Sequence, residues 1–249
     1  MMKEKIFDEI LETIENDDIK IFGEKCIRKI EPYFWEVPAS SSLKYHAAYA
    51  CTVPLGLAKH TVALVRFLNH MFSVESIRDQ FTSRERDLLR IAGMMHDTRK
   101  SGTQEDYEKS HYTKFDHPIQ AANVIRGLDG LPKDEIEFIA HVIESHMGQW
   151  NTDKRHPGVV LPTPQDKAQI ILHLADYLAS RKDIEIKFDN LPDVQPALPD
   201  ISTWIVKFGK YKEAGLTLPQ IAEKDPGYIS WAKNNVTIEP ARSLLQTLN

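Results

Sequence analysis

Apolar residues recur at intervals of three and four positions through roughly the first 190 residues, which predicts helices rather than strands. The clearest helix spans Leu57–Phe72, where Leu57, Leu64, Leu68 and Met71 form one stripe. The other helices that this spacing predicts are Glu4–Glu15, Lys20–Ile30, Glu85–His96, a segment that starts at Pro118, Lys133–Ser145 and Gln165–Lys182.

Capping and turn residues mark several boundaries between these helices. Thr82, with Glu85 three positions later, predicts a capping box before the helix that ends at His96. Pro118 suits a first helical turn. The segment Pro32–Tyr49 is rich in aromatic and small residues and is expected to be irregular, and Ser101–Asp116 is expected to be a polar loop.

The composition changes after about residue 190. Three prolines, Pro192, Pro196 and Pro199, indicate a linker, and the tail beyond them alternates, turns and ends in a short helical pattern. We therefore place a domain boundary near residue 195. The expected fold is mainly α, with a helical domain over residues 1–190 (core about 32–185) and a small α+β module over residues 200–249.

Composition narrows the class of protein. Hydrophobic residues make up 42% and charged residues 27% of the 249 positions, as in ordinary globular domains. No apolar run approaches the roughly 18 residues of a membrane span. The N-terminus is acidic and unlike a signal peptide, and Cys26 and Cys51 lack CxxC spacing, so we expect a cytoplasmic protein. The net charge of -5 argues against a strongly basic nucleic-acid-binding surface without excluding a nucleic-acid substrate.

Two histidines and two aspartates fall on the apolar faces of three predicted helices. His60 lies on the stripe of Leu57–Phe72, His96 and Asp97 end the next long helix, and Asp176 lies on the buried side of the last one. A carboxylate that faces a core is costly unless it is paired or bound to metal, and sharing a divalent cation would satisfy all four groups. Mixed nitrogen and oxygen donors favour manganese, iron, nickel or zinc over calcium.

Each of these four residues, taken alone, could have a purely structural role instead of binding metal. A single buried histidine is more often a hydrogen-bonded core residue than a ligand, and a buried aspartate can cap a helix or pair with an arginine. One His-Asp dipeptide arises by chance in many proteins. The joint pattern of four such residues seldom does.

Further polar residues extend the pattern. Lys100, three residues beyond Asp97, could neutralise a phosphate oxygen or be a solvated lysine favoured by the helix dipole. His117 and His146 lie at helix ends and are candidate ligands of a second ion. His141 lies roughly 140° from His146 on an ideal helix, so it is expected to contact substrate or to pack rather than to share an ion with His146. Four other histidines have no predicted role: His70, His111, His156 and His173. Of these, His111 and His156 lie in loops that could overhang a site.

The order His60, His96-Asp97, Asp176 resembles the H…HD…D signature of the HD-domain metal-dependent phosphohydrolases. MMHDTRK resembles that superfamily's HDxGK element, with Arg99 in place of the glycine. Over residues 32–185 the chain is similar to the bacterial HD-domain 3′–5′ exoribonucleases: VPASSSLKYHAAY leads to GLAKHTVALV, and HVIESHMG is followed by LPTP and ILHLAD, with Met147 in place of a second histidine. The resemblance implies a mostly helical fold with His60, His96, Asp97 and Asp176 on one metal. It also implies His117 and His146 as additional ligands, and hence one or two divalent ions (manganese, iron, nickel, zinc or magnesium).

The tail carries a second resemblance. KFGKYKEAGLTLPQIAEKDPGYISWAKNNV is similar to the small C-terminal module of exodeoxyribonuclease X. Its lysines and aromatic residues interleave as a surface that stacks bases and contacts phosphates would, and Lys210 and Lys212 are candidate substrate contacts. In a module this small, at least two of Phe208, Tyr228 and Trp231 are also expected to form the core.

Three functional hypotheses follow. The first is a metal-dependent 3′–5′ exonuclease on single-stranded nucleic acid, with Asp97 as ligand and orienter of water and Lys100 stabilising the phosphate; its activity should fall in acid because the ligands must be deprotonated. The second is a phosphohydrolase of nucleoside mono- or triphosphates. The third is a non-catalytic protein that binds a nucleotide or a partner. The pattern is compatible with RNA and with DNA, and it predicts no oligomeric state.

Overall fold

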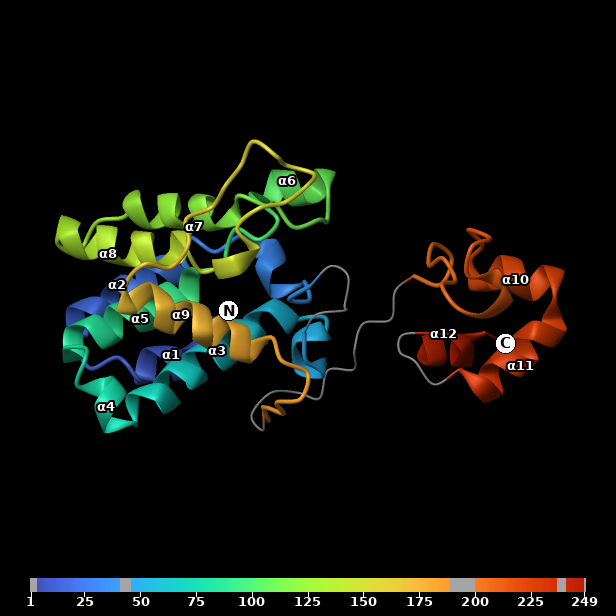
Figure 1. The fold of residues 1–249 in the computed structure, drawn as a ribbon, viewed down its shortest axis with the longest axis horizontal. Coiled ribbons are helices and arrows are strands. Elements are labelled where there is room, and N and C mark those ends of the chain that lie inside the picture. The colour runs from blue at the N-terminus through green and yellow to red at the C-terminus, as the bar shows by residue number, and fades with distance from the viewer. Residues whose placement is uncertain (1–3, 41–45, 189–199, 237–240, 249) are drawn as a thin grey trace. The chain divides into compact units, whose positions relative to one another are not determined.

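The computed structural model describes residues 4–40, 46–188, 200–236 and 241–248, and its described residues are mainly helical (Figure 1). The chain divides into two compact units, residues 1–196 and 197–249. The three prolines of the expected linker lie outside the described residues, as does the expected boundary near residue 195. Among the described residues, no helix combines the length and hydrophobicity that crossing a bilayer requires.

The first unit is an all-helical assembly around α3. Its helices are α1 (Asp8–Glu12), α2 (Asp17–Ile27), α3 (Gly56–Phe72), α4 (Glu75–Arg78), α5 (Ser83–Met95), α6 (Gln104–Lys109), α7 (His117–Arg126), α8 (Lys133–Glu144) and α9 (Lys167–Ala179). Short 3-10 turns, η1 to η4, span Glu4–Phe7, Pro32–Trp35, Ala48–Cys51 and Gly148–Trp150. Helix α3 packs against α5 and α9, and α7 pairs with α8.

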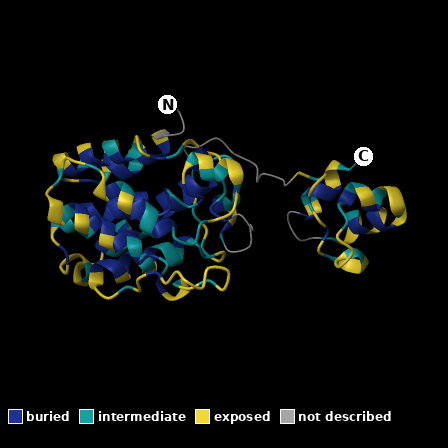
Figure 2. Ribbon diagram, turned by 90° about the horizontal axis from the view of Figure 1, so that it is seen from above, coloured by how far each residue is buried: buried dark blue, intermediate teal, exposed yellow. Residues whose placement is uncertain are grey.

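Burial explains why α3 is central. Leu57, Leu64 and Leu68 of its stripe are fully buried, and Ala58 and Ala63 on other faces are buried too, so the helix is covered nearly all round along most of its length. Figure 2 shows the same distribution across this unit, with buried residues inside and exposed ones on the outer turns.

A glycine sets the distance between α3 and α5. A Cβ on Gly93 of α5 would lie 2.7 Å from Leu64 Cδ2 of α3, which is closer than side chains pack. Glycine inside a helix costs about 1 kcal/mol relative to alanine. Here it allows the close approach that brings together the helices carrying His60 and His96.

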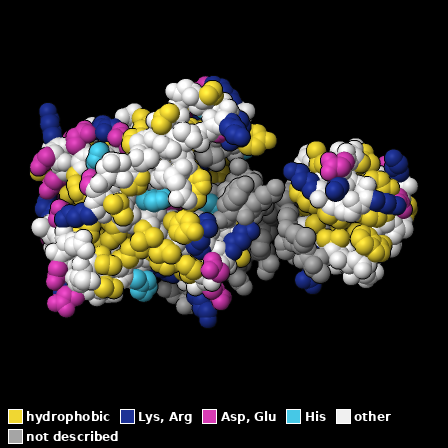
Figure 3. Space-filling view, viewed as in Figure 1, with side chains coloured by type: hydrophobic (Ala, Val, Ile, Leu, Met, Phe, Trp, Pro, Cys, Tyr) yellow, Lys and Arg dark blue, Asp and Glu magenta, His cyan; other side chains and the backbone are white. Residues whose placement is uncertain are grey.

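Hydrophobic side chains also gather on the outer face of α9 (Figure 3). Ile170 and Leu174, one turn apart, are exposed there. The ring of Trp150 stacks on Tyr177 of the same helix, with centroids 6.0 Å apart.

Several helix boundaries differ from the expectations. The segment Glu4–Glu15 is not one helix: a 3-10 turn leads into α1, which ends at Glu12, and α2 starts at Asp17 rather than Lys20. The break has a physical cause, because the buried carboxylate of Asp87 accepts hydrogen bonds from the backbone amides of Glu15 and Asn16 and turns the chain.

The loop expected over Ser101–Asp116 contains a short helix, α6. Its signal was present in the sequence: Thr103 and Asp106 form a reciprocal capping box. The box expected at Thr82 and Glu85 is confirmed, and it starts α5 at Ser83.

The second unit has its own small core. Helices α10 (Leu218–Lys224), α11 (Pro226–Asn235) and α12 (Ala241–Thr247), with the 3-10 turn η5 (Gly209–Tyr211), enclose Val206, Leu218, Ile221, Ile229, Leu244 and Leu245. The expected α+β character is not confirmed. In the described part of this unit, the extended residues form an isolated bridge between Ile205 and Thr217 and no strand.

Asp87 generates a prediction about stability. Its buried carboxylate also pairs with Arg90 at 2.6 Å, so Asp87→Ala leaves a buried charge and two amides unpaired. We expect the free energy of unfolding, measured by urea denaturation, to fall by about 3–5 kcal/mol. Asp79→Ala, which removes an exposed pair with Arg78, should cost below about 0.5 kcal/mol. Equal losses in the two variants would contradict the capping role of Asp87.

Candidate metal centre

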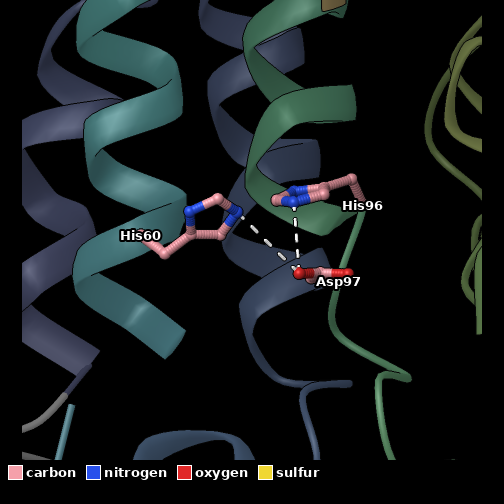
Figure 4. Close-up of side chains that lie close together, drawn as sticks. All are labelled: His60, His96 and Asp97. Carbon is pink, nitrogen blue, oxygen red and sulfur yellow. Dashed lines mark ion pairs between the residues drawn. The ribbon is translucent and has the colours of Figure 1, made fainter. Parts of the chain in front are cut away.

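Six of the side chains named from the sequence meet in one cluster. His60 lies in the second turn of α3, His96 follows the last residue of α5, and Asp97 comes next. The other three are His117, the first residue of α7, His146, just beyond α8, and Asp176 of α9. Figure 4 shows the rings of His60 and His96 directed at the Asp97 carboxylate from two neighbouring helices.

One group of donors surrounds Asp97 Oδ2 and Asp176 Oδ1. His60 Nε2 lies 2.9 Å from Asp176 Oδ1 and 3.9 Å from Asp97 Oδ2. His96 Nε2 lies 3.4 Å from Asp97 Oδ2 and 3.7 Å from Asp176 Oδ1. Two imidazoles and two carboxylates from three helices therefore converge here.

A second group surrounds the other oxygen of Asp97. His117 Nε2 lies 3.0 Å and His146 Nε2 3.6 Å from Asp97 Oδ1, and the two ring nitrogens are 3.3 Å apart. The two oxygens of one carboxylate thus face two different sets of histidines.

The backbone fixes the tautomers of three of these rings. The Nδ1 atoms of His96, His117 and His146 lie 2.7–2.8 Å from the carbonyl oxygens of Gly93, Lys114 and Ile143 respectively. Because a carbonyl oxygen only accepts, each Nδ1 carries the proton. In the neutral ring, Nε2 then presents a lone pair to the centre, which is the second-sphere arrangement of metal-binding histidines.

The donor set fits a divalent cation. Among the described residues, His60 Nε2, His96 Nε2 and Asp97 Oδ1 are buried atoms without a hydrogen-bond partner, a costly state in a low-dielectric interior. Three overlapping triplets of residues could each hold an ion, because the donor atoms within each triplet lie within 4.8 Å of one another. The triplets are His60-His96-Asp97, His96-His146-Asp176 and Asp97-His117-His146. A cation between such lone pairs would satisfy them, and mixed nitrogen and oxygen donors suit a first-row transition metal.

The pKa shifts of Asp97, Asp176 and His146 agree with this, whereas the shift of His96 is in the opposite direction. Burial alone raises the pKa of the Asp97 carboxyl, but Lys100 and His96 outweigh burial and hold that pKa well below its usual range. At Asp176 burial likewise raises the pKa, and the contact with His60 more than reverses the shift. Burial lowers the pKa of His146, whereas at His96 the charge of Asp97 overcomes burial and raises it. Ionised carboxylates and a neutral His146 are the forms that bind metal.

Lys100 lies at the open side of the cluster. Its Nζ is 2.5 Å from Asp97 Oδ2, and its side chain and that of Asp176 are 16% and 22% exposed, whereas the other cluster side chains are at most 2% exposed. Arg99, which replaces the usual glycine, forms an ion pair with Glu31.

Three other residues named from the sequence lie elsewhere. His141 is 58% exposed, with its Nε2 3.6 Å from Asp166 Oδ2, and the structure does not bring it into the cluster. Lys210 and Lys212 belong to the second unit. Lys210 Nζ lies 2.5 Å from Asp225 Oδ2, and Lys212 Nζ lies 3.9 Å from Glu213 Oε1.

Sequence reasoning missed His46. Its ring lies edge-on to that of His60, with centroids 4.8 Å apart, and burial lowers its pKa to about 2, so the ring is neutral. The KYHAAY element contains this histidine, but it lies in an irregular segment where no helical period indicates a direction.

Sequence reasoning also left His173 unassigned, although it supports His146. The Nδ1 atom of His173 donates to the His146 carbonyl at 2.7 Å. Gly148 (φ +56) makes room, since a Cβ there would come within 2.1 Å of the His173 ring. The i, i+3 spacing of His173 and Asp176 on α9 was the available signal.

A buried centre of imidazole and carboxylate donors on a helical scaffold is a site that can hold a divalent metal ion. The family model of the HD domain matches residues 56–181, half of the chain, and the protein belongs to the HD domain family. This family consists of metal-dependent phosphohydrolases, so the chain is an enzyme of this class. Residues 206–237 match the family model of the exodeoxyribonuclease X-like C-terminal domain. Comparison with curated proteins and with solved structures gives no match.

The shared position of Asp97 predicts how metal content responds to substitution. Asp97→Asn keeps the shape of the side chain but removes the charge that faces both groups of histidines. Because even outer-sphere changes weaken metal binding about 10–100-fold, we expect the purified variant to retain below about a tenth of the wild-type metal, measured by plasma mass spectrometry. His70→Asn, on the exposed face of α3, should retain all of it. Full occupancy in Asp97→Asn would show that metal binding does not need the charge of Asp97 and would contradict this prediction.

Proposed function

We propose that the protein is a 3′–5′ exonuclease acting on single-stranded nucleic acid with two divalent ions that share Asp97. The observation that carries the metal assignment is the division of the Asp97 carboxylate, one oxygen toward His60 and His96 and the other toward His117 and His146. A cytoplasmic location is part of the same proposal.

In this assignment His60, His96, Asp97 and Asp176 would hold one ion, and Asp97, His117 and His146 would hold the other. Manganese, iron, nickel and zinc all suit these donors. A divalent ion in such a site makes water acidic enough to attack at neutral pH and withdraws charge from a phosphoryl oxygen.

The chain's own groups supply the remaining steps. Lys100 is 16% exposed at the open side of the cluster, so its ammonium group lies where a phosphate would enter. There it stabilises the charge that develops on the phosphoryl oxygens. Asp97, besides being a ligand, orients the attacking water. His173 keeps His146 in place through its backbone carbonyl, so it acts as a positioning residue.

The second unit supports a polynucleotide substrate. Its match to an exodeoxyribonuclease X-like domain joins the phosphohydrolase centre to a module named after a nuclease. Phe208 and Tyr228 pack with its core, as expected, whereas Trp231 is 49% exposed beside Tyr228 with ring centroids 5.4 Å apart. An exposed indole is suited to stacking on an unpaired base. Lys210 and Lys212 would contact phosphates by exchanging their present carboxylate partners.

A phosphohydrolase of nucleoside mono- or triphosphates is the second candidate. Two observations favour a small substrate. The net charge is -5, and among the cluster side chains only those of Lys100 and Asp176 are partly exposed, so the centre is nearly closed. Substrate length distinguishes the two candidates.

Digestion of 5′-end-labelled single-stranded RNA and DNA with manganese tests the proposal. We expect a ladder of products shortened from the 3′ end, and a rate lowered by at least about 100-fold in Asp97→Asn because one change affects both ions. A nucleotide panel runs in parallel. Phosphate release from nucleotides with intact oligomers would replace the exonuclease by the nucleotide phosphohydrolase, and no hydrolysis of either substrate would reject both.

A second test addresses the exposed indole. Trp231→Ala should raise KM for a long oligonucleotide by about fivefold or more, the low end of what one base–aromatic stack contributes, and leave dinucleotide cleavage unchanged. Ser230→Ala, the exposed neighbouring position, is the control. An unchanged KM in Trp231→Ala would remove this residue from the substrate-binding surface.

A further inference from the structure

A pocket lies directly beside the metal centre. It has a volume of about 190 Å³, and Lys100 forms part of its wall. Val37 and Pro38 supply apolar surface, and Tyr107 and His111 supply two rings. Lys100 Nζ also contacts Asp97 Oδ2, so the ammonium group of Lys100 connects this pocket to the metal centre.

The aromatic wall of the pocket is held rigidly. Tyr107, on α6, stacks on Tyr33 with ring centroids 4.8 Å apart and planes at 18°. Tyr33 is buried, and its hydroxyl accepts from Ser101 N and donates to Gly102 O, each at 3.0 Å. The exposed ring of His111 stands against Tyr107 at 4.5 Å and 77°. Figure 1 shows α6 standing at the end of the α7–α8 pair.

Size and lining define the ligand class. The volume is below the roughly 300–1,000 Å³ of pockets that enclose a drug-sized molecule, so it suits one planar ring system rather than a whole dinucleotide. The aromatic and apolar side chains of the wall favour binding of an uncharged planar ring, which they can contact at its face and its edges. The ammonium group of Lys100 lies between the pocket and the metal centre, and it favours a ligand in which one phosphate is attached to that ring through a sugar.

We propose that this pocket binds the nucleoside next to the phosphoester that is cleaved, with its base against Tyr107 and His111 and its phosphate beside Lys100. The inference rests on the proposed function and deepens it, because it makes a terminal nucleoside the recognised unit. The 3′ end of an oligonucleotide and a free nucleotide both offer that unit.

The test compares substrates with and without the base. One pair is a single-stranded oligonucleotide and its counterpart with an abasic tetrahydrofuran residue at the 3′ end. The other pair is a nucleoside 5′-monophosphate and ribose 5-phosphate. The first pair reports on oligonucleotide ends and the second on free nucleotides. In the wild type we expect loss of the base to raise KM by about fivefold or more, as loss of one base–aromatic stack does.

Two variants assign that preference to the pocket. His111→Ala removes an exposed ring, and Tyr107→Leu keeps bulk against Tyr33 but removes the aromatic wall. Both should bring the KM ratio of the base-less to the base-containing substrate close to one while kcat for the base-less substrate stays unchanged. Tyr112→Ala, the adjacent position with a 73% exposed ring that does not line the pocket, should keep the wild-type ratio.

Two results would overturn the inference: a wild type indifferent to the base, or a preference that persists in both variants. If the exonuclease proposal alone fails, only the second pair is hydrolysed, and the effect of the base is then measured on that pair. If both candidate functions fail, neither substrate pair is hydrolysed. In that case calorimetric titration with the nucleoside monophosphate and with ribose 5-phosphate decides. Tighter binding of the nucleotide that is lost in His111→Ala supports the pocket, and equal binding rejects it.

Discussion

The structure depends on one electrostatic constraint, the meeting of several lone pairs at a buried site. His117 Nε2 and Asp97 Oδ1 are 3.0 Å apart although the ring proton of His117 is committed to the Lys114 carbonyl. His146 Nε2, equally bare, is 3.3 Å from His117 Nε2. Lone pairs at such distances repel unless a positive charge lies between them. A divalent cation between these groups would satisfy them, and the donor set fits such an ion.

The helices supply the second sphere of the centre from their own backbones. His96, His117 and His146 each bond the carbonyl three residues earlier, so the turn that ends or begins a helix also orients the imidazole. The donors come from segments far apart in sequence, and the close approach of α3 and α5 at Gly93 is needed to assemble them. For this reason we expect metal binding to be coupled to folding and a bound ion to stabilise the first unit.

The helical period indicated most of the inner residues. His60, His96 and Asp176 lie on the apolar faces of their predicted helices, Asp97 follows the end of α5, and the structure brings all four together. Features without a period could not be found in this way. His46 lies in an irregular segment, and the turn after α1 depends on Asp87, 72 residues away from Glu15. His173 lies on the helical pattern of α9, but its role depends on the His146 carbonyl of another segment and on the room that Gly148 leaves for its ring. The tail alternates in sequence, yet its core is made by three helices, because packing rather than local pattern determined those elements.

The most direct test of the account is anomalous diffraction from crystals grown with manganese, recorded at an energy where manganese scatters anomalously. The account predicts two peaks, one on each side of the Asp97 carboxylate, the first in contact with His60, His96 and Asp176 and the second with His117 and His146. A peak remote from Asp97, or a single ion that leaves His117 and His146 without contact, would contradict it.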